Sequence, residues 1–295
     1  VVMPPNDQSR IRSAPYGASI NYYLKDIPGH LVLIEIFDES GRKIRTLRGS
    51  ANEGLNRVMW NLRHEPLKQI ELRTTPDFHP HVWEEKRFNG QDTRPVLHWG
   101  IWQPQAGVLA APGTYTVKLT AGGQEYTREL EVRKDPNSHG TEEDIKVMVQ
   151  LWEDTVQNIN EVVTMINRLE WMGKQMEEME KALAAAKDAG TVMAALRDTE
   201  SRLKAVEDKL LQRQLHASDP KSYREEMKLY SKLLWFSGEI GTGAGDIRNT
   251  QDFGPTEQQL VVYDLLSQRL DAVRQEYEQL SNEIIPEFNR ALANA

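Results

Sequence analysis

The chain of 295 residues has no cysteine, so disulfides, thiolate metal sites and cysteine nucleophiles are all excluded. It also lacks any run approaching the roughly 18 to 20 uncharged apolar residues that a membrane-spanning helix requires. The chain starts at Val1, without an initiator methionine at that position and without a basic and then apolar leader. We therefore expect no membrane span, and we interpret the chain as processed or as an excerpt of a longer protein.

Acidic residues outnumber basic residues in the second half of the chain. Residues 1–140 carry 18 Lys and Arg against 16 Asp and Glu, whereas residues 141–295 carry 18 against 28, so the net charge of −8 comes from the second half. Nucleic acids and anionic membranes bind basic surfaces. We therefore expect no nucleic-acid partner, and we interpret the acidity as a solvated helical surface.

The first half has the period-two pattern of strands. The segments that show it are Lys43 to Leu47, Leu55 to Leu62, Tyr115 to Leu119 and Tyr126 to Val132, while Leu31 to Phe37 is a compact apolar run of strand length. Ala18 to Leu24 is a sixth expected strand. Two of the turns between them contain glycine, at Gly41 and at Gly122-Gly123. The sequence predicts an antiparallel β-sandwich over 16–136, preceded by a linker over 1–15 and interrupted by a long insertion over 63–112.

The second half has the three-and-four spacing of helices. Thr141 precedes an acidic first turn, and apolar residues then follow a coiled-coil-like seam from about 142 to 188. Further helices are expected up to about 216, from Pro220 onward and after Thr256, with Pro286 kinking the last one. We predict separate α and β domains (class α+β), with residues 141–295 forming an elongated antiparallel bundle of three columns or, alternatively, four helices.

The insertion 63–112 has little periodicity and is rich in histidine and tryptophan. Loops of that length are generally functional, mobile or packed on a partner. Its aromatic rings either pack the loop onto the sandwich or a neighbouring domain, or bind a partner or a glycan. The candidate binding residues are Trp83, Trp99, Trp102 and His98. His79 and His81 are weak metal candidates because no third ligand has a defined spacing from them.

Other motifs are expected to be structural. The glycine-rich run Gly238 to Gly245 follows a helix and lacks a closing Gly-Lys-Ser/Thr, so we interpret it as a connection between helices. Glu177 and Glu178 point about 100° apart on a helix, which favours a solvated face over an acid/base pair. No nucleophile elbow is present, and no cofactor is expected.

Three segments resemble a known domain: Ile36 to Leu47, Gly54 to Arg63 and Ala111 to Leu119. They are similar to the Ig-like domain of flagellar hook-capping proteins and of many bacterial secreted proteins. That domain followed by a long helical tail resembles the C-terminal part of large exported bacterial proteins known as sialidase-like or sortilin-type β-propeller glycosyl hydrolases. Ala14 to Leu24 resembles the segment that follows their propeller.

This resemblance implies an upstream propeller that holds any catalytic centre, and an extracytoplasmic location. No family catalytic residue maps onto this chain. We expect a non-catalytic accessory module that packs on the propeller and presents its bundle to another envelope protein or to itself. The alternatives are a carbohydrate-binding or lid part of a glycosidase, and a metal-dependent hydrolase using the histidine-rich loop.

Overall fold

The computed structural model describes residues 16–76, 79–95, 106–184, 190–213, 224–242 and 252–293. The chain divides into two compact units, each considered by itself. The β unit consists of Val1–Glu65 and Leu109–Asp135, and the helical unit consists of Pro66–Val108 and Pro136–Ala295. Antiparallel sheets and α-helices are therefore segregated along the chain, which confirms the mixed α and β composition.

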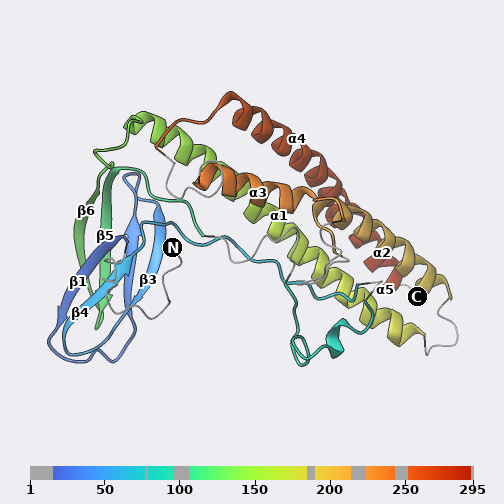
Figure 1. The fold of residues 1–295 in the computed structure, drawn as a ribbon. Helices are drawn as coiled ribbons and strands as arrows, with labels where there is room; N and C mark the ends of the chain where they lie inside the picture. The colour runs from blue at the N-terminus through green and yellow to red at the C-terminus, as the bar shows by residue number, and fades with distance from the viewer. Residues whose placement is uncertain are drawn as a thin grey trace, which may run out of the picture. The chain divides into compact units, whose positions relative to one another are not determined.

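The β unit has two antiparallel sheets (Figure 1). Its described strands are β1 (Ala18–Leu24), β2 (Val32–Phe37), β3 (Lys43–Gly49), β4 (Gly54–Trp60), β5 (Gly113–Ala121) and β6 (Gln124–Val132). One sheet pairs β1 with β4, and the other has the order β3-β2-β5-β6. Each strand corresponds to one of the six segments that the sequence predicts as strands.

Turn residues set the hairpins of the larger sheet. Asp38 closes the β2–β3 turn, because its Oδ1 accepts hydrogen bonds from the backbone N–H groups of Ser40 and Arg42, both at 3.0 Å. Gly122 and Gly123 have φ angles of 57° and 77° at the β5–β6 turn. Both values lie in the left-handed region that a two-residue type I′ hairpin requires. The glycine pair therefore fixes which residues of β5 and β6 pair with each other.

The two sheets share one apolar core. Trp60 from β4 is completely buried and contacts Tyr115 from β5 edge to face, with ring centroids 5.4 Å apart. Its indole N–H donates to the Arg63 carbonyl oxygen at 2.9 Å, which satisfies the one polar group that its burial removes from water. Ile34 and Ile36 of β2 are also fully buried in this core.

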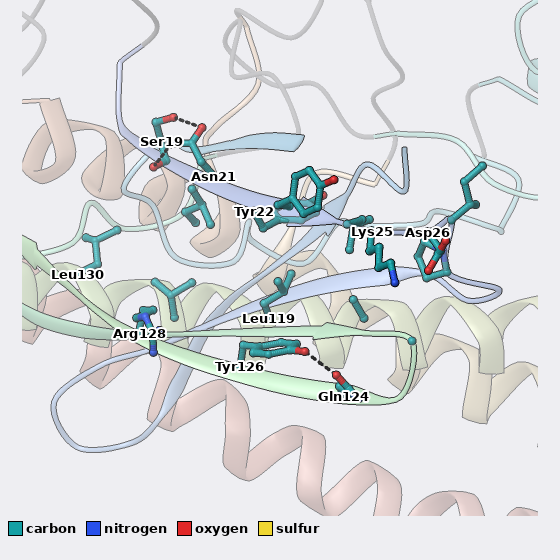
Figure 2. A pocket seen from close by; sticks show the side chains of 18 of the residues that line it. Ser19, Asn21, Tyr22, Lys25, Asp26, Leu119, Gln124, Tyr126, Arg128 and Leu130 are labelled. Carbon is teal, nitrogen blue, oxygen red and sulfur yellow. Dashed lines mark hydrogen bonds between the residues drawn. The ribbon is translucent and has the colours of Figure 1, made fainter. Parts of the chain in front are cut away.

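The core is open along one flank, between β1 and β6. A cleft of about 750 Å³ lies there, which we call the β cleft (Figure 2). Its apolar lining belongs to the inner faces of β1, β5 and β6, and includes Ile20, Tyr22, Leu24, Val117, Leu119 and Leu130.

The helical unit is built on one long helix. Its helices are α1 (Glu142–Leu183), α2 (Gly190–Leu210), α3 (Leu229–Thr242), α4 (Glu257–Gln279) and α5 (Ile285–Ala293). Thr141 and Thr256 form capping boxes at the starts of α1 and α4, where side-chain oxygens accept backbone N–H groups that have no partner within the helix. α3 packs along the first half of α1 and α2 along its second half, and α4 contacts all three (Figure 1).

Polar contacts join these helices at specific points. Trp152 of α1 donates its indole N–H to Ser237 Oγ of α3 at 2.9 Å. Arg274 of α4 forms a bidentate pair with Glu161 of α1, through Nε at 2.6 Å and Nη2 at 2.9 Å. This pairing raises the pKa of Arg274.

The predicted irregularity at Pro286 takes the form of a π-helical turn, Leu280–Ile284, directly before α5. The Ile285 N–H donates to the Leu280 carbonyl oxygen. Proline cannot donate the next helical hydrogen bond and its ring clashes with the preceding turn, so the wider turn accommodates it.

Three helix boundaries differ from the sequence expectation. The second helix was expected up to about 216, but α2 ends at Leu210. The third helix was predicted to begin at Pro220, but α3 begins at Leu229, and residues 214–223 lie outside the described part. Gly238 was assigned to a connection between helices, yet it lies within α3. The glycine-rich sequence therefore placed the end of this helix before Gly238, whereas α3 continues to Thr242. Among the described helices, none is both long and apolar enough to cross a membrane.

Candidate functional site

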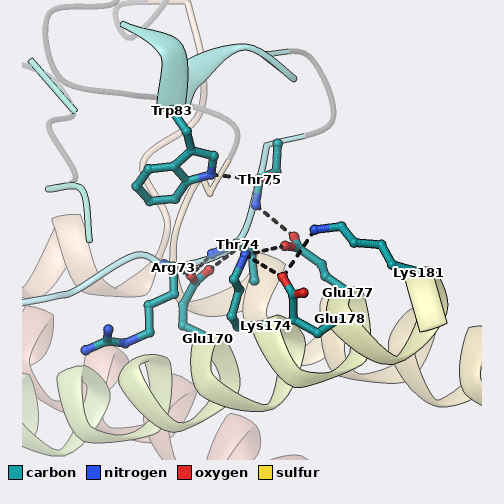
Figure 3. A network of polar contacts seen from close by, with 9 residues as sticks. All are labelled: Arg73, Thr74, Thr75, Trp83, Glu170, Lys174, Glu177, Glu178 and Lys181. Atoms are coloured by element: carbon teal, nitrogen blue, oxygen red, sulfur yellow. Dashed lines mark hydrogen bonds and ion pairs between the residues drawn. The ribbon is translucent and has the colours of Figure 1, made fainter. Parts of the chain in front are cut away.

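An extended segment, Pro66 to Pro76, runs along α1 and is called the strap (Figure 3 shows its second half). Five of its backbone N–H groups donate to side chains of α1. Four pairs are Lys68 with Asn160 Oδ1 at 2.8 Å, Glu71 with Asn167 Oδ1 at 2.9 Å, Thr74 with Glu170 Oε2 at 2.7 Å, and Thr75 with Glu177 Oε1 at 2.8 Å. The fifth donor is Arg73, which also donates to Glu170 Oε2. The side chains of α1 thus take the place of a neighbouring strand.

The spacing of these pairs follows from the geometry of the two segments. From Asn160 to Glu177, a helix rising 1.5 Å per residue advances about 26 Å. From Lys68 to Thr75, an extended chain advances about 24 Å. The strap and this stretch of α1 therefore remain in register, and Leu67, Ile70 and Leu72 of the strap are buried in the helical unit.

Glu170 is the centre of this arrangement. Its side chain is fully buried, and it accepts the backbone N–H groups of Arg73 and Thr74 and the Thr74 hydroxyl, the last at 2.9 Å. One turn further on, a Cβ placed on Gly173 would lie 2.9 Å from Thr74 Cγ2. Glycine at this position therefore allows the strap to approach the helix backbone.

Buried charges surround Glu170. Arg94 pairs its backbone with Leu72 of the strap and donates from Nη2 to the Arg213 carbonyl oxygen at 3.0 Å. Burial lowers the pKa of Arg94 to about 10, so it remains charged at neutral pH. Burial, followed by repulsion from Glu170, raises the pKa of Glu207 well above its usual value. The cluster therefore holds two buried arginines, Arg94 and Arg213, beside Glu170 and beside Glu207, whose raised pKa favours its neutral form.

An aromatic pocket of about 460 Å³ lies between the strap region and α1. Three rings line it, those of Trp83, Phe88 and Trp171, together with Arg73, Gly90, Gln91, Asp92 and Lys174. The Arg73 guanidinium lies 4.0 Å from the centroid of the Trp171 ring, a cation–π contact. The indole N–H of Trp83 donates to Thr75 Oγ1 at 3.2 Å, which fixes the ring beside the strap (Figure 3).

Both cations of the aromatic pocket already have carboxylate partners. Arg73 pairs with Glu71, and Lys174 lies 3.4 Å from Glu177 and 3.2 Å from Glu178. The pocket therefore offers aromatic faces, cations that are already paired, and a polar edge that includes Asp92. These features suit the stacking of a neutral ring.

The sequence-predicted site residues fall into two groups. Trp83 lies in the aromatic pocket, whereas His98, Trp99 and Trp102 lie outside the described residues. His81 contacts Glu84 at 3.0 Å on the exposed surface. Within the described residues, no group of three or more His, Asp or Glu side chains could hold a metal ion.

The insertion belongs to a different unit than its place in the chain indicates. Residues 63–112 were assigned to the β-sandwich, but Pro66–Val108 forms a compact unit with the helices. The physical reason is the row of acceptors on α1, which satisfies the backbone of the strap. This row also changes the interpretation of Glu177, which binds Thr75 instead of lying on a purely solvated face.

Sequence reasoning missed the polar row of α1. Its members Asn160, Thr164, Asn167, Glu170, Lys174 and Glu177 follow helical spacing beside the apolar seam. The available signal was Glu170 itself, a charged residue placed next to Leu169 of that seam. Such polar rows usually face solvent, so the pattern alone did not identify a binding partner.

A second candidate surface is the helical groove between α3 and α4, of about 500 Å³. Apolar side chains of both helices line it, namely Trp235, Phe236, Val262, Leu265 and Leu266, together with Met227, which precedes α3. Trp235 is 51% exposed and Leu265 is 46% exposed. Lys232, Glu239 and Arg269 stand at its edges. The groove thus combines an apolar floor with a charged rim.

Comparison with protein-family models, curated proteins and solved structures finds no match to this chain.

Proposed function

We propose that this chain is a non-catalytic interaction module that binds an amphipathic helix of a partner protein in the helical groove. The observation that carries the proposal is the exposure of large apolar side chains along that groove. Trp235 on α3 and Val262 and Leu265 on α4 lie beside one another around a single hollow. Contiguous exposed apolar surface of this kind marks interaction sites.

The dimensions and charges of the helical groove suit a helix. α4 has 23 residues and α3 has 14, so the groove extends over several helical turns. An incoming helix would bury its apolar stripe against the floor, as in other helix-in-groove complexes. Lys232 pairs with Glu226 at 3.1 Å, whereas Arg269 makes no ion pair among the described residues. A carboxylate on the partner helix would therefore face Arg269.

The parent protein in this proposal is an exported β-propeller protein. The support is the resemblance of the β segments and of the domain order to the C-terminal region of such proteins, and the β unit would then be an Ig-like sandwich packed on the propeller. Peptide mapping of the native protein tests this part. Peptides with Asp-box repeats joined upstream of Val1 are expected, and a native protein without a propeller would contradict it.

Photo-cross-linking tests the helical groove directly. A photoreactive residue at position 262 should produce one predominant adduct in the producing cells, mapping to an amphipathic helix of the partner. The same residue at position 147 is the matched control, because Val147 is 46% exposed on α1 and Val262 is 41% exposed on α4. Replacing Trp235 by Ala should reduce the adduct about tenfold, because buried Trp anchors dominate such interfaces. Equal adducts from both positions would refute the proposal.

A second candidate function is glycan binding at the aromatic pocket. The specific support is the grouping of Trp83, Phe88 and Trp171 around one hollow whose cations are already paired. A neutral sugar ring could stack on these faces. On an array of neutral glycans, Trp171→Ala should abolish binding while Trp235→Ala does not, since the two tryptophans are equally exposed. Loss in neither variant, or in both, would contradict glycan binding at this pocket.

A further inference from the structure

The free edge of β1 is the starting observation. β1 pairs with β4 on one side, and no described strand pairs with its other side. Its seven residues, Ala18–Leu24, include no charged residue and no proline. Exposed edge strands usually carry such residues because unpaired backbone groups attract other strands. β6, the facing edge, does carry charged residues, among them Glu125, Arg128 and Glu131. Among the described edge strands β1, β3, β4 and β6, β1 is therefore the one without a charged residue.

The inner face of the larger sheet, which lies opposite β1, is exposed near its β6 edge. Along one cross-strand row, Ile34 of β2 pairs with Leu119 of β5, which pairs with Tyr126 of β6. Exposure rises along this row from 0% at Ile34 to 55% at Tyr126. The two-stranded sheet therefore covers the centre of the larger sheet and stops short of β6. The β cleft is the space where one more strand would continue the smaller sheet (Figure 2).

Arg128 places a positive charge among the apolar residues of the β cleft. Arg128 lies on the inner row of β6, between Tyr126 and Leu130, and lines the cleft. Its guanidinium donates to the Thr127 carbonyl oxygen at 3.0 Å and forms no ion pair among the described residues. Glu129 and Asp26 also line the cleft, and Figure 2 shows Lys25 and Asp26 beyond the end of β1, away from Arg128. A cation in an apolar row favours an acidic side chain opposite it.

We propose that the β cleft receives one extended strand from a partner protein, which pairs with the free edge of β1. The inserted strand would present alternate side chains to Leu119 and Leu130, with a carboxylate facing Arg128. Seven residues at about 3.3 Å each would span β1. Backbone hydrogen bonds supply affinity in this recognition mode, and the alternate side chains supply specificity. The site lies in the β unit, so it is independent of the helical groove.

A designed peptide tests the proposal on the full chain. The probe has seven residues that alternate valine and threonine, with glutamate at one central valine position. We expect binding by isothermal titration calorimetry, with chemical-shift changes in β1 and β6. A peptide with lysine in place of glutamate should bind about tenfold more weakly, the effect of roughly 1.4 kcal/mol for one charge pair. The variant Arg128→Glu should reverse this order, and it leaves the core unchanged because Arg128 is exposed.

Backbone pairing is tested by N-methylation of the probe. Methyl groups on the amide nitrogens that face β1 should abolish binding, whereas methyl groups on the opposite edge should not. Equal effects of the two patterns, or no dependence on Arg128, would overturn the proposal. So would nuclear Overhauser contacts from another part of this chain, or from a second copy, to the free edge of β1 in the absence of peptide.

Discussion

The strap is attached to α1 mainly through Glu170, and Glu170→Gln tests this reasoning. The carboxylate accepts two backbone N–H groups and one hydroxyl in a fully buried position. An amide has one acceptor oxygen, so its NH2 group would confront one of these donors and the charge opposite Arg94 would be lost. Hydrogen bonds to charged groups contribute about 1.5 to 3 kcal/mol each, and breaking a buried charge pair costs about 3 to 5 kcal/mol. We expect a loss of about 3 to 4 kcal/mol.

Urea unfolding followed by circular dichroism measures this loss, and amide hydrogen exchange locates it. Exchange at Arg73 and Thr74 should accelerate more than exchange in the middle of α4. The matched control is Asn167→Ala, which removes contacts to Glu71 and Gln69 on the exposed side of the same row. This control should cost only about 1 kcal/mol. A Glu170→Gln variant as stable as the control would refute the central role of Glu170.

Three further perturbations have defined outcomes. Because burial raises the pKa of Glu207 in the folded state, its contribution to stability should be greatest below the unfolded pKa and be lost as pH rises toward the folded pKa. Glu207→Gln should therefore reduce the fall in melting temperature as pH rises above the unfolded pKa, and an unchanged pH dependence of the melting temperature would contradict this. Gly173→Ala should destabilise by about 1 to 2 kcal/mol in urea, since overpacking against Thr74 outweighs the helix-propensity gain; a stabilised variant would show that the strap moves freely. Asn56→Ala should cost about 2 to 4 kcal/mol by thermal unfolding, because its buried amide donates to Asn52 and Gly54 carbonyl oxygens and accepts from Ser50; a change below 1 kcal/mol would contradict its role in the turn.

The strands and the start of the long helix were predictable because their causes are local. Alternation along β5 reflects one buried face, the apolar run of β2 predicted a strand by its length and composition, and the glycine pair Gly122-Gly123 sets the hairpin that follows β5. The capping box at Thr141 begins α1 where the sequence indicated. Helix ends were less predictable. Glycine lowers helix propensity by only about 1 kcal/mol, and packing of α3 on α1 maintains the helix through Gly238.

The candidate site was only partly predictable. Trp83 was singled out as a binding residue and lines the aromatic pocket, but its partner ring Trp171 was hidden in a helical pattern. The pairing of strap and helix joins residues almost a hundred positions apart, such as Glu71 and Asn167. No local periodicity encodes such a contact, because the contact depends on which face of α1 packs against the strap.

By itself, the sequence determined the segregation of strands and helices, the hairpin turns and the helix caps, since each depends on residues within a few positions of one another. Only the tertiary structure assigned Pro66–Val108 to the helical unit and left open the flank between β1 and β6. It also placed Glu170, Glu207 and Arg94 in one buried cluster. These features follow from long-range packing, in which buried backbone and charged groups must find partners wherever the fold supplies them.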